Sequence, residues 1–239
     1  MSILKTIYLQ HLNGSNNNIT LAADGKVGIG TSTPLSKIHI SEANTGVYPA
    51  ITLENTVSSG LTPGVSINWT QGGTVKSSIE SNVYGNDYMA FKVSSNIERM
   101  RINSDGYVTK PSQPAFWVYQ ASGSTAVVDT VVKYTGISYN IGSCYSSSTG
   151  RFTAPVAGRY LFSFSGMGDA TSNRVMMRFQ INGNDTTFAS ASAAAYSDVK
   201  ATVIYTLNAG DYVNVIARTN NFYSNGNGVE FYFSGYLLG

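Results

Sequence analysis

Apolar and polar residues alternate in short runs along the first 45 residues of the chain. A period of two places side chains on opposite faces of an extended strand, so these runs predict β-strands. An Asp-Gly pair at 24–25 separates two of the runs, and this dipeptide favours a tight hairpin turn. The runs are Ile7–Leu9, Ile19–Leu21, Val27–Ile29 and Lys37–Ser41.

A second group of alternating runs occupies residues 46–110. Val65, Ile67 and Trp69 alternate before Gly72-Gly73, and further runs surround Phe91 and Ile102. Residues 46–110 are therefore expected to form a small middle β unit. Residues 111–114 are predicted to be a linker, because prolines at both ends favour extended chain and cannot donate to a β-ladder.

The last part of the chain, 115–239, contains about nine apolar runs separated by Gly and Asn turn signals, a pattern typical of a sandwich or jelly roll. No helix of about ten residues or more is indicated. The sequence therefore predicts an all-β protein. It has an N-terminal region (1–45) for attachment or a shaft, a middle unit (46–110), a linker (111–114) and a head (115–239).

Composition excludes several classes of function. Charged residues make up 12% of the chain and the net charge is +2 without a basic cluster, which argues against nucleic-acid binding. No apolar run is long enough to cross a membrane as a helix, and the N-terminus lacks the continuous apolar segment of a secretory signal, so neither insertion nor secretion is expected. The single cysteine, Cys144, is interpreted as a small buried residue.

No catalytic motif is complete. Gly28-Ile-Gly30 lacks the third glycine and the helix of a dinucleotide site. The two histidines, His11 and His39, both lie in the N-terminal region, and a metal role would require histidines from several chains to meet on one axis. The chain is therefore predicted not to be an enzyme; a polysaccharide depolymerase is the enzymatic alternative, and it would need paired carboxylates in a groove.

The head carries a spaced signature of aromatic residues with one Asn and one Gly: Tyr134, Asn140, Tyr145, Phe152, Gly158, Tyr160, Phe162 and Phe164. Through this signature the head resembles the globular domain of the complement C1q family over roughly 113–239. The resemblance implies a ten-strand jelly roll of the C1q and tumour necrosis factor type that assembles as a homotrimer. No cofactor is expected, and the alternative that the resemblance implies is a bound calcium ion. The candidate carboxylates for calcium are Asp169, Asp185, Asp198 and Asp211.

Segments 24–34, 37–40 and 98–107 resemble recurring pieces of bacteriophage tail-fibre and related virion proteins. This resemblance implies a virion appendage made in the host cytoplasm, whose N-terminal region contacts other virion proteins. The head would then adhere to a host surface glycan or an outer-membrane protein. The alternative is a capsid or neck fibre, or a decoration protein, whose head only trimerises the chain.

Two sets of residues are candidates for binding. A loop with aromatic rings among Asn and Gly, containing Asn221, Phe222, Tyr223 and Asn225, is predicted to bind the receptor, with a flexible connector as the alternative. Aromatic residues of two strands are predicted to form the head core or the trimer interface. Tyr232 and Tyr236 alternate with the phenylalanines and are the better interface candidates. This set is Tyr160, Phe162, Phe164, Phe231, Tyr232, Phe233 and Tyr236.

Overall fold

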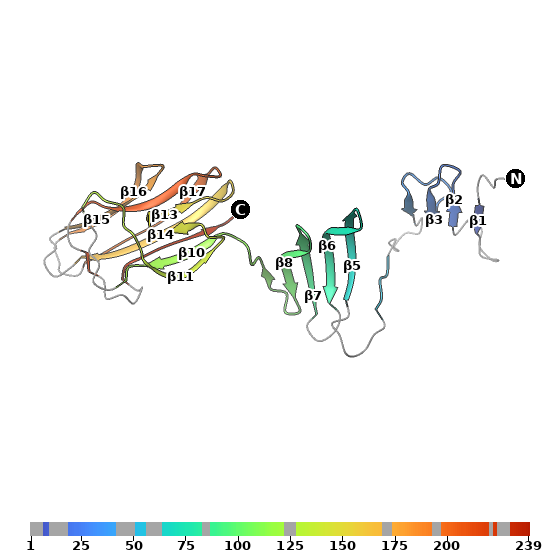
Figure 1. Ribbon diagram of the computed structural model, residues 1–239, viewed down its shortest axis with the longest axis horizontal. Helices are drawn as coiled ribbons and strands as arrows, with labels where there is room; N and C mark the ends of the chain where they lie inside the picture. Colours follow the sequence, from blue (N-terminus) through green and yellow to red (C-terminus); the bar gives the residue numbers. More distant parts are fainter. Residues whose placement is uncertain are drawn as a thin grey trace. The chain divides into compact units, whose positions relative to one another are not determined.

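The computed structural model describes residues 7–9, 19–41, 51–55, 64–82, 87–121, 128–168, 174–192, 197–219, 222–223 and 230–239. All regular elements in these ranges are β-strands, which confirms the all-β prediction. The chain divides into two compact units, Met1–Val65 and Ser66–Gly239. Figure 1 shows the strands along the chain.

The N-terminal region forms a four-stranded sheet in the order β1-β2-β3-β4. The strands are β1 (Ile7–Leu9), β2 (Ile19–Leu21), β3 (Val27–Ile29) and β4 (Ile38–Ile40). The predicted hairpin joins β2 to β3, with Gly25 at φ +79° supplying the left-handed turn residue. β4 pairs with β3 in parallel. Gly30 is required at this crossover because a Cβ there would lie 2.1 Å from the carbonyl oxygen of Ser41.

The middle unit is a five-stranded sheet in chain order. Its first two strands are joined by Gly72-Gly73, whose φ angles of +57° and +76° suit a two-residue hairpin turn. Residues 51–55, expected to be part of this unit, form no strand, and Ile51 is 71% exposed. The strands are β5 (Gly64–Gln71), β6 (Thr74–Asn82), β7 (Tyr88–Val93), β8 (Ile97–Asn103) and β9 (Val108–Thr109).

The head is a sandwich of two antiparallel sheets, as predicted. Sheet I has the order β11-β10-β20-β14-β17, with β19 (Phe222–Tyr223) beside β14. Its strands are β10 (Ala115–Tyr119), β11 (Gly136–Ile141), β14 (Gly158–Gly168), β17 (Asp198–Leu207) and β20 (Tyr232–Leu237). Sheet II has the order β12-β13-β18-β15-β16. Its strands are β12 (Tyr145–Ser146), β13 (Arg151–Thr153), β15 (Arg174–Ile181), β16 (Asn184–Ser192) and β18 (Tyr212–Ala217).

Aromatic rings fill the space between the two sheets. Phe116 meets Phe233 edge-to-face at 4.8 Å, and Phe164 meets Phe179 across the sandwich at 4.6 Å between centroids. Each such ring contributes about 2–3 kcal/mol by burial. The packing leaves no room at Gly235, where a Cβ would lie 2.6 Å from Phe116 and 2.7 Å from Phe162. Cys144 is 5% exposed, so the structure confirms it as a buried residue.

Candidate functional site

The predicted aromatic set divides between the two faces of sheet I. The side chains on its inner face are all at most 1% exposed and form the head core: Tyr160, Phe162, Phe164, Phe231 and Phe233. Tyr232 is half-buried and Tyr236 is 45% exposed. Both lie on the outer face because β20 alternates Tyr232, Phe233, Ser234, Gly235 and Tyr236.

The outer face of sheet I carries large apolar side chains from four of its five main strands, β11, β10, β20 and β17. The register places Trp117 of β10 opposite Tyr139 of β11, and Ala115 opposite Tyr236 of β20. Ile204 of β17 is 58% exposed. We call this surface the aromatic face, and it consists of Trp117, Tyr139, Ile141, Ile204, Tyr232 and Tyr236. An exposed apolar surface of this kind is typical of a protein contact surface.

Trp117 organises the aromatic face. Its ring meets Tyr139 at 6.5 Å and Tyr232 at 6.4 Å, both nearly edge-on. Neighbouring rings that hold one another in place lose little rotamer freedom when a partner covers them. The face can therefore act as a rigid contact surface. The charged side chains of this face, Arg159, Asp198 and Lys200, lie near the ends of β14 and β17.

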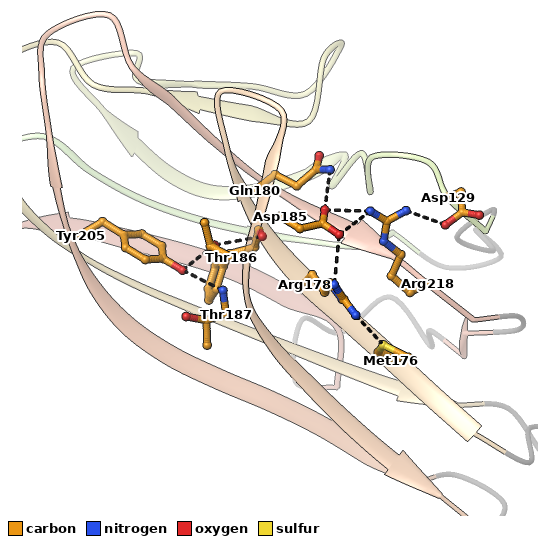
Figure 2. Close-up of polar contacts among 10 residues, drawn as sticks. Asp129, Met176, Arg178, Gln180, Asp185, Thr186, Thr187, Tyr205 and Arg218 are labelled. Atoms are coloured by element: carbon orange, nitrogen blue, oxygen red, sulfur yellow. Dashed lines mark hydrogen bonds and ion pairs between the residues drawn. The ribbon is translucent and has the colours of Figure 1, made fainter.

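The outer surface of sheet II carries a different arrangement, a network of ion pairs that we call the Asp185 cluster: Asp129, Arg178, Gln180, Asp185 and Arg218. Figure 2 shows that the side chains converge on the Asp185 carboxylate from three sides. The Arg218 Nη2 donates to both oxygens of Asp185 at 2.7 and 2.6 Å, and its Nη1 donates to Asp129 at 2.7 Å. Arg178 donates to the Asp185 carboxylate at 3.1 Å, and the Gln180 side-chain amide donates to the same carboxylate at 2.9 Å.

This cluster holds its charges in their ionised forms. Hydrogen bonds from Gln180 and then Arg218 lower the pKa of Asp185, because they stabilise the carboxylate. Hydrogen bonds to Asp129 and then Asp185 raise the pKa of Arg218. The cluster joins β15, β16 and β18 to the segment at Asp129, so its chemistry is that of a structural brace.

A second polar contact in Figure 2 closes the sandwich between the two sheets. The Tyr205 hydroxyl of β17 in sheet I lies 2.7 Å from the Thr186 hydroxyl of β16 in sheet II. Thr186 also donates to the carbonyl oxygen of Phe179 at 3.0 Å. These contacts tie the edge strands of the two sheets together and fix how they pack.

The carboxylates considered for calcium have other partners in the structure. Asp185 is bound by two arginines, Asp198 pairs with Lys200 at 3.0 Å, and Asp211 accepts from Asn182 at 2.9 Å. Asp169 lies outside the described residues. Within the described ranges, no three His, Cys, Asp or Glu side chains gather in a group that suits a metal ion.

The predicted receptor loop contains one residue that the structure places in the core. Phe222 is 2% exposed and stacks on Phe231 at 5.4 Å between ring centroids. The expectation that this ring lies on the surface is therefore wrong. The reason is that β19 pairs with the end of β14, which turns Phe222 inward opposite Gly168. Tyr223 pairs with Met167 through its backbone. Asn221 and Asn225 lie outside the described residues, and the binding role of the loop stays a prediction.

Sequence reasoning missed most of the aromatic face. Trp117 and Tyr139 come from strands that pair only after the chain has folded, and neither was a candidate. The alternation of Phe116, Trp117 and Val118 was the available signal, because it places Trp117 on the face opposite the core.

No helix among the described residues is long and apolar enough to span a membrane.

Residues 115–238 match the family model described as C1q domain. The globular domain of zebrafish complement 1qA shares 21% identity, with 53% of this chain and 98% of that chain covered and a TM-score of 0.46. A tumour necrosis factor, Eiger, from S. frugiperda shares 12% identity over 54% of this chain and 94% of its own, with a TM-score of 0.46. Murine APRIL shares 12% identity over 53% and 99%, with a TM-score of 0.45. Curated proteins gave no match.

Proposed function

The chain belongs to the C1q domain family through residues 115–238, and we propose that it is the subunit of a homotrimeric bacteriophage fibre whose head adheres to the host cell surface. The observation that carries this proposal is the aromatic face. A single chain leaves Trp117, Tyr139 and Tyr236 each more than a third exposed, on a sheet whose other face is fully packed. Domains of this family form homotrimers, and the aromatic face is the surface of the head suited to that contact.

The trimer gives the head its mode of action. Three identical binding sites on one trimer raise the effective concentration of the second and third contacts, so weak single contacts become a stable attachment. The ligand would be a host surface glycan or an outer-membrane protein. The loop 220–228 is the candidate contact, because its Asn and Gly residues around Tyr223 offer adaptable hydrogen bonds.

The virion location is supported by the N-terminal region. Its segment 24–34 resembles virion fibre proteins, and two of its glycines have a structural reason in the small sheet. A Cβ at Gly28 would lie 2.4 Å from the carbonyl oxygen of Thr31, and one at Gly30 would meet Ser41. Exposed Leu35 (84%), in the connection between β3 and β4, and Ile38 (67%), on β4, provide apolar surface for contact with other virion proteins.

The first test is the solution mass of the full chain by light scattering. A mass near three times 25.5 kDa supports the trimer. A monomer over the whole concentration range would remove the avidity mechanism and overturn the proposal.

The second test measures adhesion by the trimer. The labelled full chain is applied to an array of bacterial surface polysaccharides and to outer-membrane vesicles. The heat-denatured chain is the background control. Saturable binding that the unlabelled trimer competes supports a receptor-binding head. A trimer that binds neither surface would contradict adhesion and favour the alternative, a capsid, neck or decoration protein with a structural head.

A further inference from the structure

The middle sheet has one face that is closed by its own charged side chains. The register places Glu80 opposite Ala90 and Ser78 opposite Lys92. Lys92 donates to Glu80 at 2.6 Å, above Ala90, which is fully buried. The Arg101 guanidinium lies 3.8 Å from the Tyr88 ring centroid and pairs with Glu98 at 2.6 Å. This polar face is therefore satisfied within one chain.

The opposite face of the same sheet is apolar. Alternation along β6, β7 and β8 and the register pair Ile79 with Phe91 and Met100 in one row. A second row pairs Met89 with Ile102 and Val108, and the uncharged Ser81 of β6 lies opposite Met89 in the same row. Met89 is 43% and Val108 is 52% exposed, while the other four are partly exposed. We call this surface the apolar face, and it consists of Ile79, Met89, Phe91, Met100, Ile102 and Val108, none of which is ionisable.

A sheet with one apolar face needs a second layer to bury it. Within the described part of the middle unit, β5 to β9 form a single sheet (Figure 1), and no second layer from the same unit lies among the described strands. Six partly exposed apolar side chains in two adjacent rows would also make the sheets of different molecules associate if the face stayed uncovered. The face therefore requires a partner.

A short segment connects the middle sheet to the head. β9 ends at Thr109 and β10 begins at Ala115, so the middle sheet is tethered to the head by at most roughly 22 Å of chain. The link is anchored, because Arg99 donates to Ser112 at 2.9 Å and Gln113 donates to the carbonyl oxygen of Leu237. A trimeric head thus holds three middle sheets together at high effective concentration.

We propose that the apolar faces of the middle sheets pack against one another in the homotrimer and form a second intersubunit core. The inference rests on the proposed homotrimer. Identical copies meet without like-charge repulsion because the apolar face carries no charge, while the ion pairs Glu80–Lys92 and Glu98–Arg101 remain on the solvent side of each sheet. The middle unit then contributes to assembly as well as spacing the head.

The test is disulfide cross-linking through introduced cysteines, which is possible because the chain has only one cysteine of its own. Cys144 is 5% exposed and burial raises its pKa to about 11, so the native thiol does not compete in oxidation. Val108→Cys places a thiol on the apolar face. Thr109→Cys is the matched control, because it is the adjacent exposed residue, opposite Arg101 on the polar face. Both variants are made in the full chain and oxidised under the same conditions.

The inference predicts that Val108→Cys forms covalent dimers within the trimer at least about tenfold faster than Thr109→Cys, at a rate independent of protein concentration. Met89→Cys, on the neighbouring strand, is expected to behave like Val108→Cys. A trimeric chain in which both faces cross-link equally, or Thr109→Cys faster, overturns this inference and leaves the proposed function intact. A monomeric chain overturns both.

Discussion

The Tyr145 hydroxyl bridges the backbone of Tyr134 inside the head: it accepts from the Tyr134 N–H at 3.0 Å and donates to the Tyr134 carbonyl oxygen at 3.2 Å. The hydroxyl of Tyr134 itself is buried and has no hydrogen-bond partner among the residues that the structure describes. The two hydroxyl groups therefore have opposite effects on the stability of the head. The hydrogen-bonded hydroxyl of Tyr145 stabilises the fold, whereas burying the unpaired hydroxyl of Tyr134 costs free energy.

We expect Tyr145→Phe to lower the free energy of unfolding by about 1–3 kcal/mol, because it leaves a buried N–H and C=O unpaired. Tyr134→Phe is expected to be neutral or stabilising by about 1 kcal/mol, because it removes an unpaired hydroxyl and keeps the ring. Denaturant unfolding at one fixed protein concentration compares the two variants. A clear loss of stability in Tyr134→Phe would show that this hydroxyl has a partner.

The aromatic core was predictable because its signal is local. Tyr160, Phe162 and Phe164 alternate within one strand, so a period of two is enough to place them on one face. The aromatic face was not, because Trp117 of β10 pairs with Ser234 of β20 at the far end of the chain. Which rings surround Trp117 is decided by strand order, and the sequence pattern does not carry strand order.

The Asp185 cluster was unpredictable for the same physical reason. Arg218 reaches Asp129 and Asp185, which are separated from it by 89 and 33 positions in the sequence. The burial of Phe222 is a third case: the Asn- and Gly-rich composition around it is typical of a loop, but pairing of β19 with β14 turns its ring into the core. Composition predicts exposure only where no tertiary pairing overrides it.

Stability should fall in alkaline solution through Cys144. Burial raises its pKa from 9.0 to about 11, so the folded chain keeps a proton that the unfolded chain releases. The contribution is fully present below pH 9 and is lost as the pH rises towards 11, because the unfolded state then binds fewer protons. Urea unfolding between these values should show a steeper decline for the native chain than for Cys144→Ala. Equal slopes would contradict a buried thiol.

Acid should weaken the Asp185 cluster. The pKa of Asp185 is lowered by its hydrogen bonds to Gln180 and Arg218, so the unfolded chain takes up a proton first as the pH falls. This stabilisation is present above the ordinary value of 3.8 and is lost as the pH drops through the folded value. We expect Asp185→Asn to be less stable than the native chain at pH 7, by at most about 1 kcal/mol because the pair is accessible to water. The difference should shrink in acid; Asp198→Asn, at the exposed Asp198–Lys200 pair of the same head, is the control.

Gly30→Ala should open the N-terminal sheet and spare the head. The residue has φ +72°, where a side chain costs about 1–2 kcal/mol, and its Cβ would also meet the Ser41 carbonyl oxygen. Gly25→Ala is the matched control, since φ is +79° and the nearest atom is the Lys37 Nζ at 3.7 Å. Hydrogen exchange of the full chain should show lost protection at Val27 and Ser41 in Gly30→Ala only. Equal loss in both variants would mean that strain, and not the contact with Ser41, decides.

The aromatic face makes a prediction that separates self-association from folding. Ile204 on this face is 58% exposed, and Phe188 on the outer face of sheet II is 55% exposed. Both side chains leave the core undisturbed when they are replaced, so Ile204→Glu and Phe188→Glu change the charge of two equally accessible positions on opposite sheets.

We expect Ile204→Glu to convert the proposed homotrimer to monomers, because a carboxylate covered by an apolar partner loses its hydration without gaining a counter-ion. Phe188→Glu should stay trimeric, since its new carboxylate lies beside the Arg178 guanidinium, now 5.3 Å from the Phe188 ring centroid. Light scattering gives the mass of each variant and near-ultraviolet circular dichroism confirms that the core is intact. Were Phe188→Glu to dissociate while Ile204→Glu remained a trimer, the contact surface would have to be moved to sheet II.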